Sequence, residues 1–406
     1  MKRKFELSLT KNYVADWNVY DALRELIQNA IDQEITVPDN EKSIVYKDET
    51  LYISNKSSVL ERQSLLLGHT SKQDDDKTIG QFGEGYKIAF LVLTRLGKTV
   101  TVYNYGAKET WTVNFSKLKK YNYEEVLVVT VDDAYPWTKV PDNNLTIKVE
   151  NITPDEYEGL IERTLFLQDG VDSEETPYGD ILFSDQHKGK FFVNGLYVTT
   201  NNEFSNGYNI KPEFMEIGRD RNLVDSYNLR NMTRRMWVFS QDNKRKLDLI
   251  KDEASDVYEI GYTPPTYSSL VKSETELYTK LNALAEAAYL QFKEEYGEKA
   301  TPVSTESENR EIRIKYKGLR PIVVNSTTKS LINNKSVTYR QDLKNHAKTE
   351  MNYRDEIELF ILDTTFSTTA DAILAMLESV FDFCDDNGYQ EYLDERKSEV
   401  KLEPDS

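Results

Sequence analysis

Three polar residues recur along one short segment at a spacing that suits an α-helix. In VYDALRELIQNAIDQE, residues 19 to 34, Glu25, Asn29 and Asp32 fall in a stripe roughly 60° wide if each residue turns the chain by about 100°. A carboxylate can polarise a water molecule, and an amide oxygen can bind Mg²⁺, because hard cations prefer oxygen ligands. A solvated helix face with no chemistry explains the same pattern.

A second segment, IGQFGEGYK at 79 to 87, has the composition of a phosphate-binding loop. Gly80, Gly83 and Gly85 permit positive φ and a close approach of the backbone to a ligand. The apolar run that follows predicts a helix ending near Gly97. Backbone N–H groups at a helix N-terminus attract anions, and Lys87 adds positive charge there.

Other glycine-rich nucleotide motifs do not fit this segment. A Walker A loop places Lys directly after its last Gly and then Ser or Thr, whereas Tyr86, Lys87 and Ile88 follow Gly85. A dinucleotide fingerprint reads G-x-G-x-x-G, and the order here is G-x-x-G-x-G. The later motifs of protein kinases are absent from the sequence.

Together the two segments resemble the GHKL ATPases. This superfamily contains gyrase-type topoisomerases, ninety-kilodalton heat-shock chaperones, histidine kinases, MutL-type mismatch-repair proteins and MORC proteins. The resemblance covers residues 18 to 150, with motif blocks in the family's order. It implies that Glu25 is the general base, Asn29 the Mg²⁺ ligand and Asp32 the third polar position of the helix. It also implies nucleotide contacts from the glycine segment: Gly80, Gly83, Gly85, Tyr86 and Lys87.

Two further blocks concern the adenine. The family's second block ends a strand with Asp-x-Gly, and LYISNKSSVL places Asn55 and Ser57 at those positions. An Asn oxygen can accept a hydrogen bond from the adenine amino group but carries no charge. A simple turn residue after a strand is the alternative for Asn55. In NNLTIKVENI, Thr146 matches the family's threonine near the adenine, although β-propensity explains it equally well.

The segment LLLGHTSKQDDDKT resembles the start of the ATP lid in the mismatch-repair and MORC branches. By that resemblance Ser71 and Lys72 contact phosphate when the lid closes. We expect residues 74–76, all Asp, on the solvated side because they would repel a triphosphate. His69 either positions the lid by packing or contacts the nucleotide.

The organisation predicted for the chain is α/β throughout. Residues 1–150 form a Bergerat-type ATP-binding sandwich, with helices on one face of a sheet. Residues 151–265 form a transducer-like α/β domain, in which ILFSDQHKGKFFVNGLYVTT reads as two alternating strands joined by a Gly-containing turn. A helical connector covers 266–300, and 310–406 form a small C-terminal α/β region with an acidic tail.

Within these later parts, Glu274–Tyr296 is predicted to be helical and TPVSTESEN to be a linker. REIRIKYKGLRPIVVN and EIELFILDTT are predicted strands, and ADAILAMLESVFDF is a predicted amphipathic helix. In the gyrase and mismatch-repair branches a basic side chain of the transducer reaches the γ-phosphate. Arg219 and Arg221 are the candidates here, with Lys211 nearby, because guanidinium groups suit phosphate. A salt bridge with Asp220 or Asp225 is equally simple.

Composition indicates a cytoplasmic protein without a membrane span. The 406 residues are 39% apolar, enough for two or three cores. Cys384 is the only cysteine, so no internal disulfide framework is available. No run approaches the length of a membrane-spanning helix, and the first residues contain no apolar signal segment.

Charge gives a mixed indication about nucleic acid. The net charge of −18 disfavours general adhesion to DNA or to anionic membranes. The segment 228–251 nevertheless holds seven Lys and Arg against two Asp. This segment is a candidate DNA contact, a solvated helix face or a surface that docks the acidic tail.

Three functional classes follow from the resemblance. The first is an ATP-driven clamp or remodelling factor that acts on DNA or a protein client, in which ATP closes the lid and joins two copies in a homodimer. The second is a histidine kinase, although the region before residue 20 is short for a phosphoacceptor helix pair. The third is a nucleotide-binding interaction protein with weak or no hydrolysis, favoured by Asn55 and Ser57. The chain also resembles uncharacterised prokaryotic and phage ATP-binding proteins.

Overall fold

The computed structural model describes residues 2–37, 40–65, 85–119, 122–133, 145–215, 226–262, 274–364 and 367–386. The chain divides into two compact units. Unit 1 comprises Met1–Ser173, Gly179–Asn202 and Asn206–Asp225, and unit 2 comprises Glu174–Tyr178, Glu203–Ser205 and Ser226–Ser406. The domain boundaries predicted near residues 150, 265 and 300 stay predictions.

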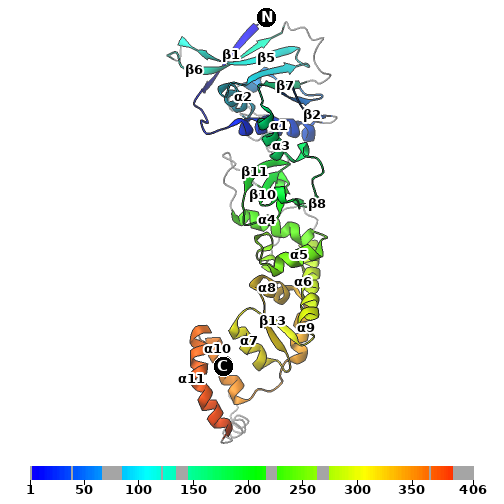
Figure 1. The fold of residues 1–406 in the computed structure, drawn as a ribbon, viewed down its shortest axis with the longest axis vertical. Helices are drawn as coiled ribbons and strands as arrows, with labels where there is room; N and C mark the ends of the chain where they lie inside the picture. The colour runs from blue at the N-terminus through cyan, green and yellow to red at the C-terminus, as the bar shows by residue number, and fades with distance from the viewer. Residues whose placement is uncertain are drawn as a thin grey trace, which may run out of the picture. The chain divides into compact units, whose positions relative to one another are not determined.

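Unit 1 contains a seven-stranded antiparallel sheet with two helices on one face (Figure 1). The strand order is β1-β6-β5-β4-β7-β3-β2. The fold is therefore mixed α/β, as predicted. The strands are β1 (Lys2–Thr10), β2 (Lys42–Lys47), β3 (Thr50–Asn55), β4 (Thr99–Asn104), β5 (Glu109–Lys117), β6 (Glu125–Asp132) and β7 (Leu145–Glu150).

Helix α1 (Val19–Thr36) forms where the polar stripe was predicted. Asn18 caps it: its side chain accepts hydrogen bonds from the N–H groups of Tyr20 and Asp21, and Asp21 accepts one from Asn18 in return. The apolar side chains recur at helical spacing and are almost fully buried in the core under the sheet: Ala22, Leu23, Leu26, Ile27 and Ala30.

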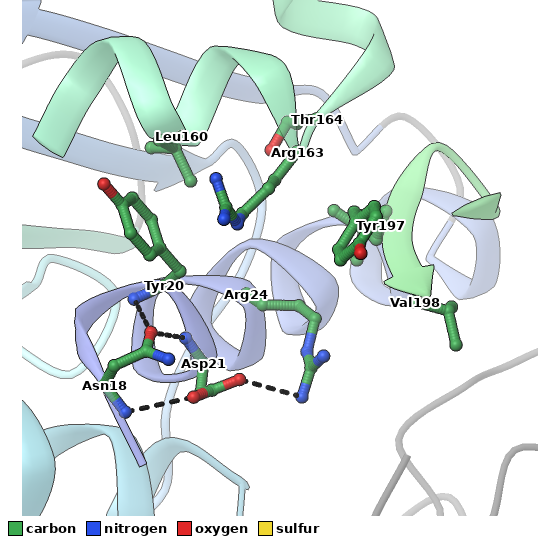
Figure 2. Close-up of a pocket in the computed structure, with 10 residues that line it drawn as sticks. Asn18, Tyr20, Asp21, Arg24, Leu160, Arg163, Thr164, Tyr197 and Val198 are labelled. Carbon is green, nitrogen blue, oxygen red and sulfur yellow. Dashed lines mark hydrogen bonds and ion pairs between the residues drawn. The ribbon is translucent and has the colours of Figure 1, made fainter. Parts of the chain in front are cut away.

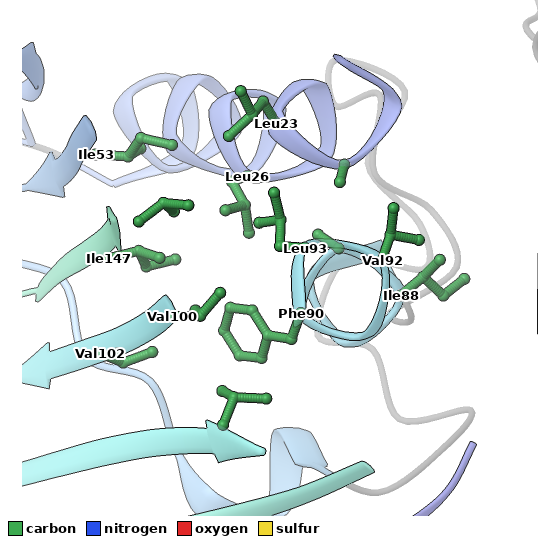
Figure 3. Packing of buried hydrophobic residues seen from close by; sticks show 14 of the residues in the cluster. Leu23, Leu26, Ile53, Ile88, Phe90, Val92, Leu93, Val100, Val102 and Ile147 are labelled. Atoms are coloured by element: carbon green, nitrogen blue, oxygen red, sulfur yellow. The ribbon is translucent and has the colours of Figure 1, made fainter. Parts of the chain in front are cut away.

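Helix α2 (Gly85–Arg95) is apolar on all sides, and every residue from Lys87 to Leu93 is buried. Such a helix is stable only inside a core, since each exposed side would cost hydration free energy. Figure 3 shows Leu26 of α1 close to Leu93 of α2, and the Phe90 ring of α2 pointing towards Val100 and Val102 of the sheet. Gly97 follows the helix with φ +78°, which confirms the predicted C-terminal glycine.

Arg95, at the end of α2, fixes the loop that leads into α1. Its guanidinium donates to the carbonyl oxygens of Lys11 and Tyr13 at 3.2 and 3.0 Å, and to those of Val14 and Trp17 at 3.0 Å each. Hydrogen bonds from a charged donor are stronger than neutral ones, and the guanidinium joins four carbonyl oxygens of one loop, of which that of Val14 also accepts from a backbone N–H, that of Trp17. Arg95 is therefore a main determinant of how α2 and the start of α1 are joined.

We predict that Arg95→Met lowers the free energy of unfolding by about 2 kcal/mol, because the methionine fills the space but donates no hydrogen bond. Urea denaturation followed by circular dichroism measures this. Arg3→Gln, at an exposed position on β1 in the same unit, is the matched control and should change stability by less than about 0.5 kcal/mol. Equal effects of the two substitutions would contradict this role.

After the first sheet the chain forms helix α3 (Pro154–Glu162). Thr153 caps α3, and Glu156 completes the capping box. Lys98 contacts the Glu156 carboxylate and donates to the Asn151 carbonyl oxygen, which ties α3 to the start of β4. Burial raises the pKa of Glu156, but the hydrogen bonds from Lys98 and Thr153 outweigh this effect and hold the pKa below its ordinary value.

Unit 1 also contains four strands in the order β11-β10-β12-β9. They are β9 (Gly179–Leu182), β10 (Lys190–Val193), β11 (Leu196–Thr200) and β12 (Gly207–Ile210), and β8 (Ser173–Thr176) precedes them. The turn between β10 and β11 is Asn194–Gly195, with φ of +48° and +79°. Two left-handed residues make a tight hairpin turn, as the sequence predicted for this region.

His187 lies buried beside these strands, 1% exposed. Its Nε2 is 2.8 Å from Gln168 Oε1, and its Nδ1 makes no hydrogen bond within the described part of the chain. Protonation would leave the buried Nδ1–H group without an acceptor. It would also add a positive charge near Lys190. Burial, and then the charge of Lys190, lower the pKa of His187.

The folded state binds this proton less readily than the unfolded chain. The contribution of His187 to the free energy of unfolding is therefore fully present above the unfolded pKa of about 6.5 and decreases as the pH drops below it. We predict that the free energy of unfolding falls less for His187→Gln than for the wild type when the pH is lowered from about 7.5 to about 5, a range around and below the ordinary histidine pKa. Urea titrations of both proteins at each pH test this. If the free energy of unfolding falls equally with pH in both proteins, His187 is not the cause of the loss of stability.

Unit 2 is mainly helical. Its helices are α4 (Ser226–Phe239), α5 (Asn243–Lys251), α6 (Glu274–Tyr296), α7 (Glu306–Lys315), α8 (Ser326–Lys335), α9 (Val337–His346), α10 (Tyr353–Thr364) and α11 (Ser367–Asp386). Strands β13 (Ala300–Val303) and β14 (Arg320–Val323) pair in parallel. Helices α6 and α11 confirm the two helices predicted there.

The sequence interpretation was wrong at three places in unit 2. The predicted linker TPVSTESEN contributes β13 and the Thr305 cap of α7, and the first part of the predicted strand REIRIK belongs to α7 itself. EIELFILDTT is helix α10 and not a strand. Its Ile357 and Ile361 are one helical turn apart, and this face packs on Ala370 and Leu374 of α11. Short apolar runs satisfy both periods, and here tertiary packing selects the helix.

Within the part of the chain that the structure describes, no helix combines the length and the apolar character needed to cross a membrane.

Candidate functional site

The polar stripe of α1 is largely enclosed. Glu25 is 5% exposed, Asp32 is fully buried and Asn29 is partly exposed. The sequence placed these residues opposite the apolar face, but neighbouring elements cover them as well. Burying two carboxylates is costly unless specific contacts hold them, so a solvated helix face does not describe this stripe.

The first residue of α2 lies against Glu25. A Cβ built on Gly85 would overlap Glu25 Oε2 and would be 3.8 Å from Asn29 Nδ2. Only glycine therefore allows the backbone of α2 to approach this carboxylate so closely. The predicted juxtaposition of the acidic helix with the end of the glycine segment is present.

The Asn29 amide is oriented by its own helix. Its Nδ2 donates to the Glu25 carbonyl oxygen at 2.8 Å, which leaves Oδ1 as the acceptor end of the side chain. No group of three or more His, Cys, Asp or Glu suited to a metal occurs among the described residues. One amide oxygen nevertheless fits Mg²⁺, which is commonly held by few protein ligands together with phosphates and water.

Asn55, the last residue of β3, is buried with a fixed orientation. Its Nδ2 donates to the Ala30 carbonyl oxygen of α1 and to Asn40 Oδ1, both at 2.9 Å. An Asp at this position would set a carboxylate oxygen against two acceptors, so the local structure itself requires the amide. The Oδ1 atom remains as the acceptor end, as the sequence interpretation expected. The contact with Asn40 was not predicted, because a residue just before β2 gives no sequence signal of a hydrogen bond to the end of β3.

Thr146 lies next to Asn55 in the sheet. Strands β3 and β7 pair Ser54 with Thr146 and Asn55 with Leu145. Thr146 is fully buried, and its hydroxyl is 2.9 Å from Ser54 Oγ. The register places the two predicted adenine-side residues on neighbouring strands, but the Thr146 side chain shares a face of the sheet with Ser54, whereas the Asn55 side chain lies on the opposite face, towards α1.

Ser57 replaces the glycine of the resembled family but keeps a glycine-like backbone. Its φ is +60°, in the left-handed region that residues other than glycine rarely adopt. The turn after β3 therefore has a backbone conformation that glycine would adopt without strain, although the residue is serine. The substitution carries a local backbone strain.

We predict that Ser57→Gly raises the free energy of unfolding by up to about 1 kcal/mol, because relief of the left-handed strain exceeds the entropy lost by a more flexible unfolded chain. Thermal and urea denaturation both measure it. Ser57→Ala is the matched control, since it removes the hydroxyl but keeps the Cβ, and it should not be stabilising. A destabilised Ser57→Gly would show that the serine hydroxyl is required in the turn.

Tyr86 and Lys87 are both held at the start of α2, and their contacts with a nucleotide stay predictions. The Tyr86 hydroxyl donates to the Ser64 carbonyl oxygen in the short helix η1 (Arg62–Leu65), and burial raises its pKa to about 12. Lys87 is fully buried, with its Nζ 5.7 Å from the Tyr86 ring centroid. Both side chains thus face the interior at the start of α2, and the positive charge of Lys87 lies beneath the surface of this site.

Several predicted site residues lie outside the described residues: Ser71, Lys72, Gly80, Gly83, Arg219 and Arg221. His69 lies outside them as well. Lys211 is described and is half-buried at the N-cap of the short helix η6 (Pro212–Phe214).

The basic segment 228–251 is partly internal to unit 2. Arg234, Arg235 and Lys246 are at most 4% exposed. Lys246 Nζ donates to the Ser240 carbonyl oxygen at 2.8 Å, and burial lowers its pKa to about 8. Arg230 pairs with Glu203 at 2.7 Å. Three of the seven cations are therefore withdrawn from the surface and are not displayed to a polyanion, whereas Lys244 and Lys251 are exposed.

Comparisons with known proteins add little to this geometry. No protein-family model matches the chain. An uncharacterized protein of Mycoplasma pneumoniae is 28% identical over 218 residues, which is 52% of this chain and 86% of that protein. The ATPase and transducer domains of DNA topoisomerase II from Balamuthia mandrillaris align over 72% of this chain and 93% of that chain, with 13% identity and a TM-score of 0.29. A likeness this low is not evidence of a shared function.

Proposed function

We propose that unit 1 binds ATP with Mg²⁺ and hydrolyses it in the manner of GHKL ATPases. The supporting observation is the close approach of Gly85 to the Glu25 carboxylate and the Asn29 amide. The acceptor end of Asn55, on the face of the sheet that α1 covers, supplies the adenine side. The proximity of the carboxylate, the amide and the glycine backbone supports the site that the motif blocks imply.

In this mechanism the protein contributes mainly position and charge. The Glu25 carboxylate orients the attacking water and accepts its proton, because it is held in place beside Gly85. Asn29 offers Oδ1 to the metal ion while its own amide hydrogens stay on α1. When bound, Mg²⁺ would neutralise charge on the phosphates.

The finer steps follow from the resemblance. Ser71 and Lys72 would contact phosphate as the lid closes, and Arg219 or Arg221 would reach the γ-phosphate. Closure would join two copies in an ATP-dependent homodimer that acts as a clamp or remodelling factor on DNA or a protein client. The organisation into an ATP domain, a transducer-like domain, a connector and a C-terminal region belongs to the same proposal.

A second candidate is a nucleotide-binding protein with little turnover. The amide of Asn55 favours it, because the uncharged side chain is built into the contact with Ala30 and Asn40 and binds adenine without a carboxylate. Such a protein would bind ATP and switch its assembly state without a hydrolytic cycle. Turnover measured beside binding separates the two candidates.

We predict that Glu25→Gln reduces ATP turnover by about 100-fold or more but preserves binding of a fluorescent ATP analogue, since the amide keeps the size and loses the base. Gly85→Ala should reduce turnover as strongly, because its Cβ displaces the Glu25 carboxylate. Steady-state phosphate release and analogue titration are the measurements.

Gly97→Asn at the other end of α2 is the matched control. A Cβ there meets nothing within 4 Å, and Asn tolerates the left-handed conformation, so turnover should stay near the wild-type value. Normal turnover by Glu25→Gln would refute the hydrolytic role. Analogue binding with no turnover by the wild type would favour the second candidate.

A further inference from the structure

A pocket separate from the Glu25–Gly85 contact lies within unit 1, where α1 begins and α3 ends (Figure 2). Its volume is about 160 Å³, close to the roughly 150 Å³ of a cavity that holds benzene. Residues of α1, α3 and β11 line it: Asn18, Tyr20, Asp21, Arg24, Leu160, Arg163, Thr164, Leu196, Tyr197 and Val198.

Arg163 is a cation of this pocket that forms no ion pair with a carboxylate among the described residues. Its guanidinium lies 4.3 Å from the Tyr20 ring centroid and 5.7 Å from that of Tyr197. One nitrogen, Nη1, donates to the Gly159 carbonyl oxygen at 3.0 Å. Among the described residues no carboxylate lies within ion-pair distance of Arg163. The aromatic rings fix the plane of the guanidinium and leave further N–H groups for a ligand.

The other charges of the pocket compensate one another. Arg24 Nη2 is 3.7 Å from Asp21 Oδ1, and the second oxygen of Asp21 accepts from the Asn18 N–H at 3.0 Å. Two arginines and one aspartate leave a net charge of one positive unit, carried by Arg163. A monoanion therefore matches the pocket, whereas a dianion would be opposed by Asp21.

The remaining walls are suited to a hydrocarbon group. Leu160, Leu196 and Val198 line the pocket beside the Tyr197 ring. Leu160 and Leu196 are part of the buried core of unit 1, so these walls are held by packing. A planar carboxylate can pair with the guanidinium of Arg163 through two parallel hydrogen bonds while its apolar part contacts these side chains.

We propose that this pocket binds a small monocarboxylate whose apolar part is about the size of an aromatic ring. Arg163 recognises the carboxylate, and Tyr20 and Tyr197 hold Arg163 in place. The pocket shares no lining residue with the contact between Glu25, Asn29 and Gly85, so the proposal stands whether or not unit 1 hydrolyses ATP.

Isothermal titration of the full-length protein with benzoate tests the proposal directly. Benzamide is the matched ligand, since it has the same ring and size but no charge. We expect benzoate to bind at least about tenfold more tightly than benzamide, a difference of about 1.4 kcal/mol. Inorganic phosphate is the third probe, and it should bind more weakly than benzoate.

Variants locate the site. Arg163→Met should weaken benzoate binding by about tenfold or more, and Arg163→Lys should weaken it in part because lysine cannot form the paired hydrogen bonds. Arg245→Gln on α5 in unit 2 is the control and should bind benzoate like the wild type. Circular dichroism checks that each variant is folded.

The proposal is overturned if benzoate and benzamide bind equally, if benzoate does not bind, or if phosphate binds more tightly than benzoate. Unchanged benzoate affinity in folded Arg163→Met would also overturn it. If Arg163→Met does not fold, the comparison of benzoate with benzamide on the wild type still decides the outcome.

Discussion

The close packing of α2 against α1 is the constraint on which the arrangement of unit 1 depends. Helix α2 is buried on all sides, so it must lie between α1 and the sheet. That position brings its first residue onto the Glu25 carboxylate, and only glycine leaves room there. The core packing and the chemistry proposed for Glu25 and Asn29 therefore share one physical cause: burial of α2 sets the distance between backbone and carboxylate.

Features with a strong local pattern could be predicted from the sequence. The helices α1, α2, α6 and α11 have long apolar periods or clear ends, and the meeting of Glu25 and Asn29 with Gly85 followed from two motif blocks. Helices α7 and α10 could not be separated from strands, because short alternating apolar runs satisfy both periods until a partner packs on them. The cap of α7 at Thr305 is also a local signal. It was not recognised, because the surrounding run of Ser, Thr and Glu has the composition of a linker.

Partners of individual polar groups were beyond the reach of the sequence. The sequence shows that residue 55 is an asparagine. Its hydrogen bonds to Ala30 and Asn40 could not be predicted, because they depend on how α1 packs on the sheet. The basic segment 228–251 shows the same limit, because charge counted along a chain does not say which cations are buried, as Arg234 and Arg235 are. The left-handed backbone of Ser57 is a further case, because a serine in the sequence gives no sign of a positive φ.

The guanidinium of Arg95 connects two regions that the chain itself keeps far apart. It holds residues 11–17, which lead directly into the Asn18 cap beside the Arg163 pocket, and it belongs to the helix that begins at Gly85. A shift of α2 along its axis must either move that loop or break four hydrogen bonds. Occupancy of the pocket and loading of a nucleotide would then have a coupling free energy, equal in both directions, without any direct contact between the two ligands.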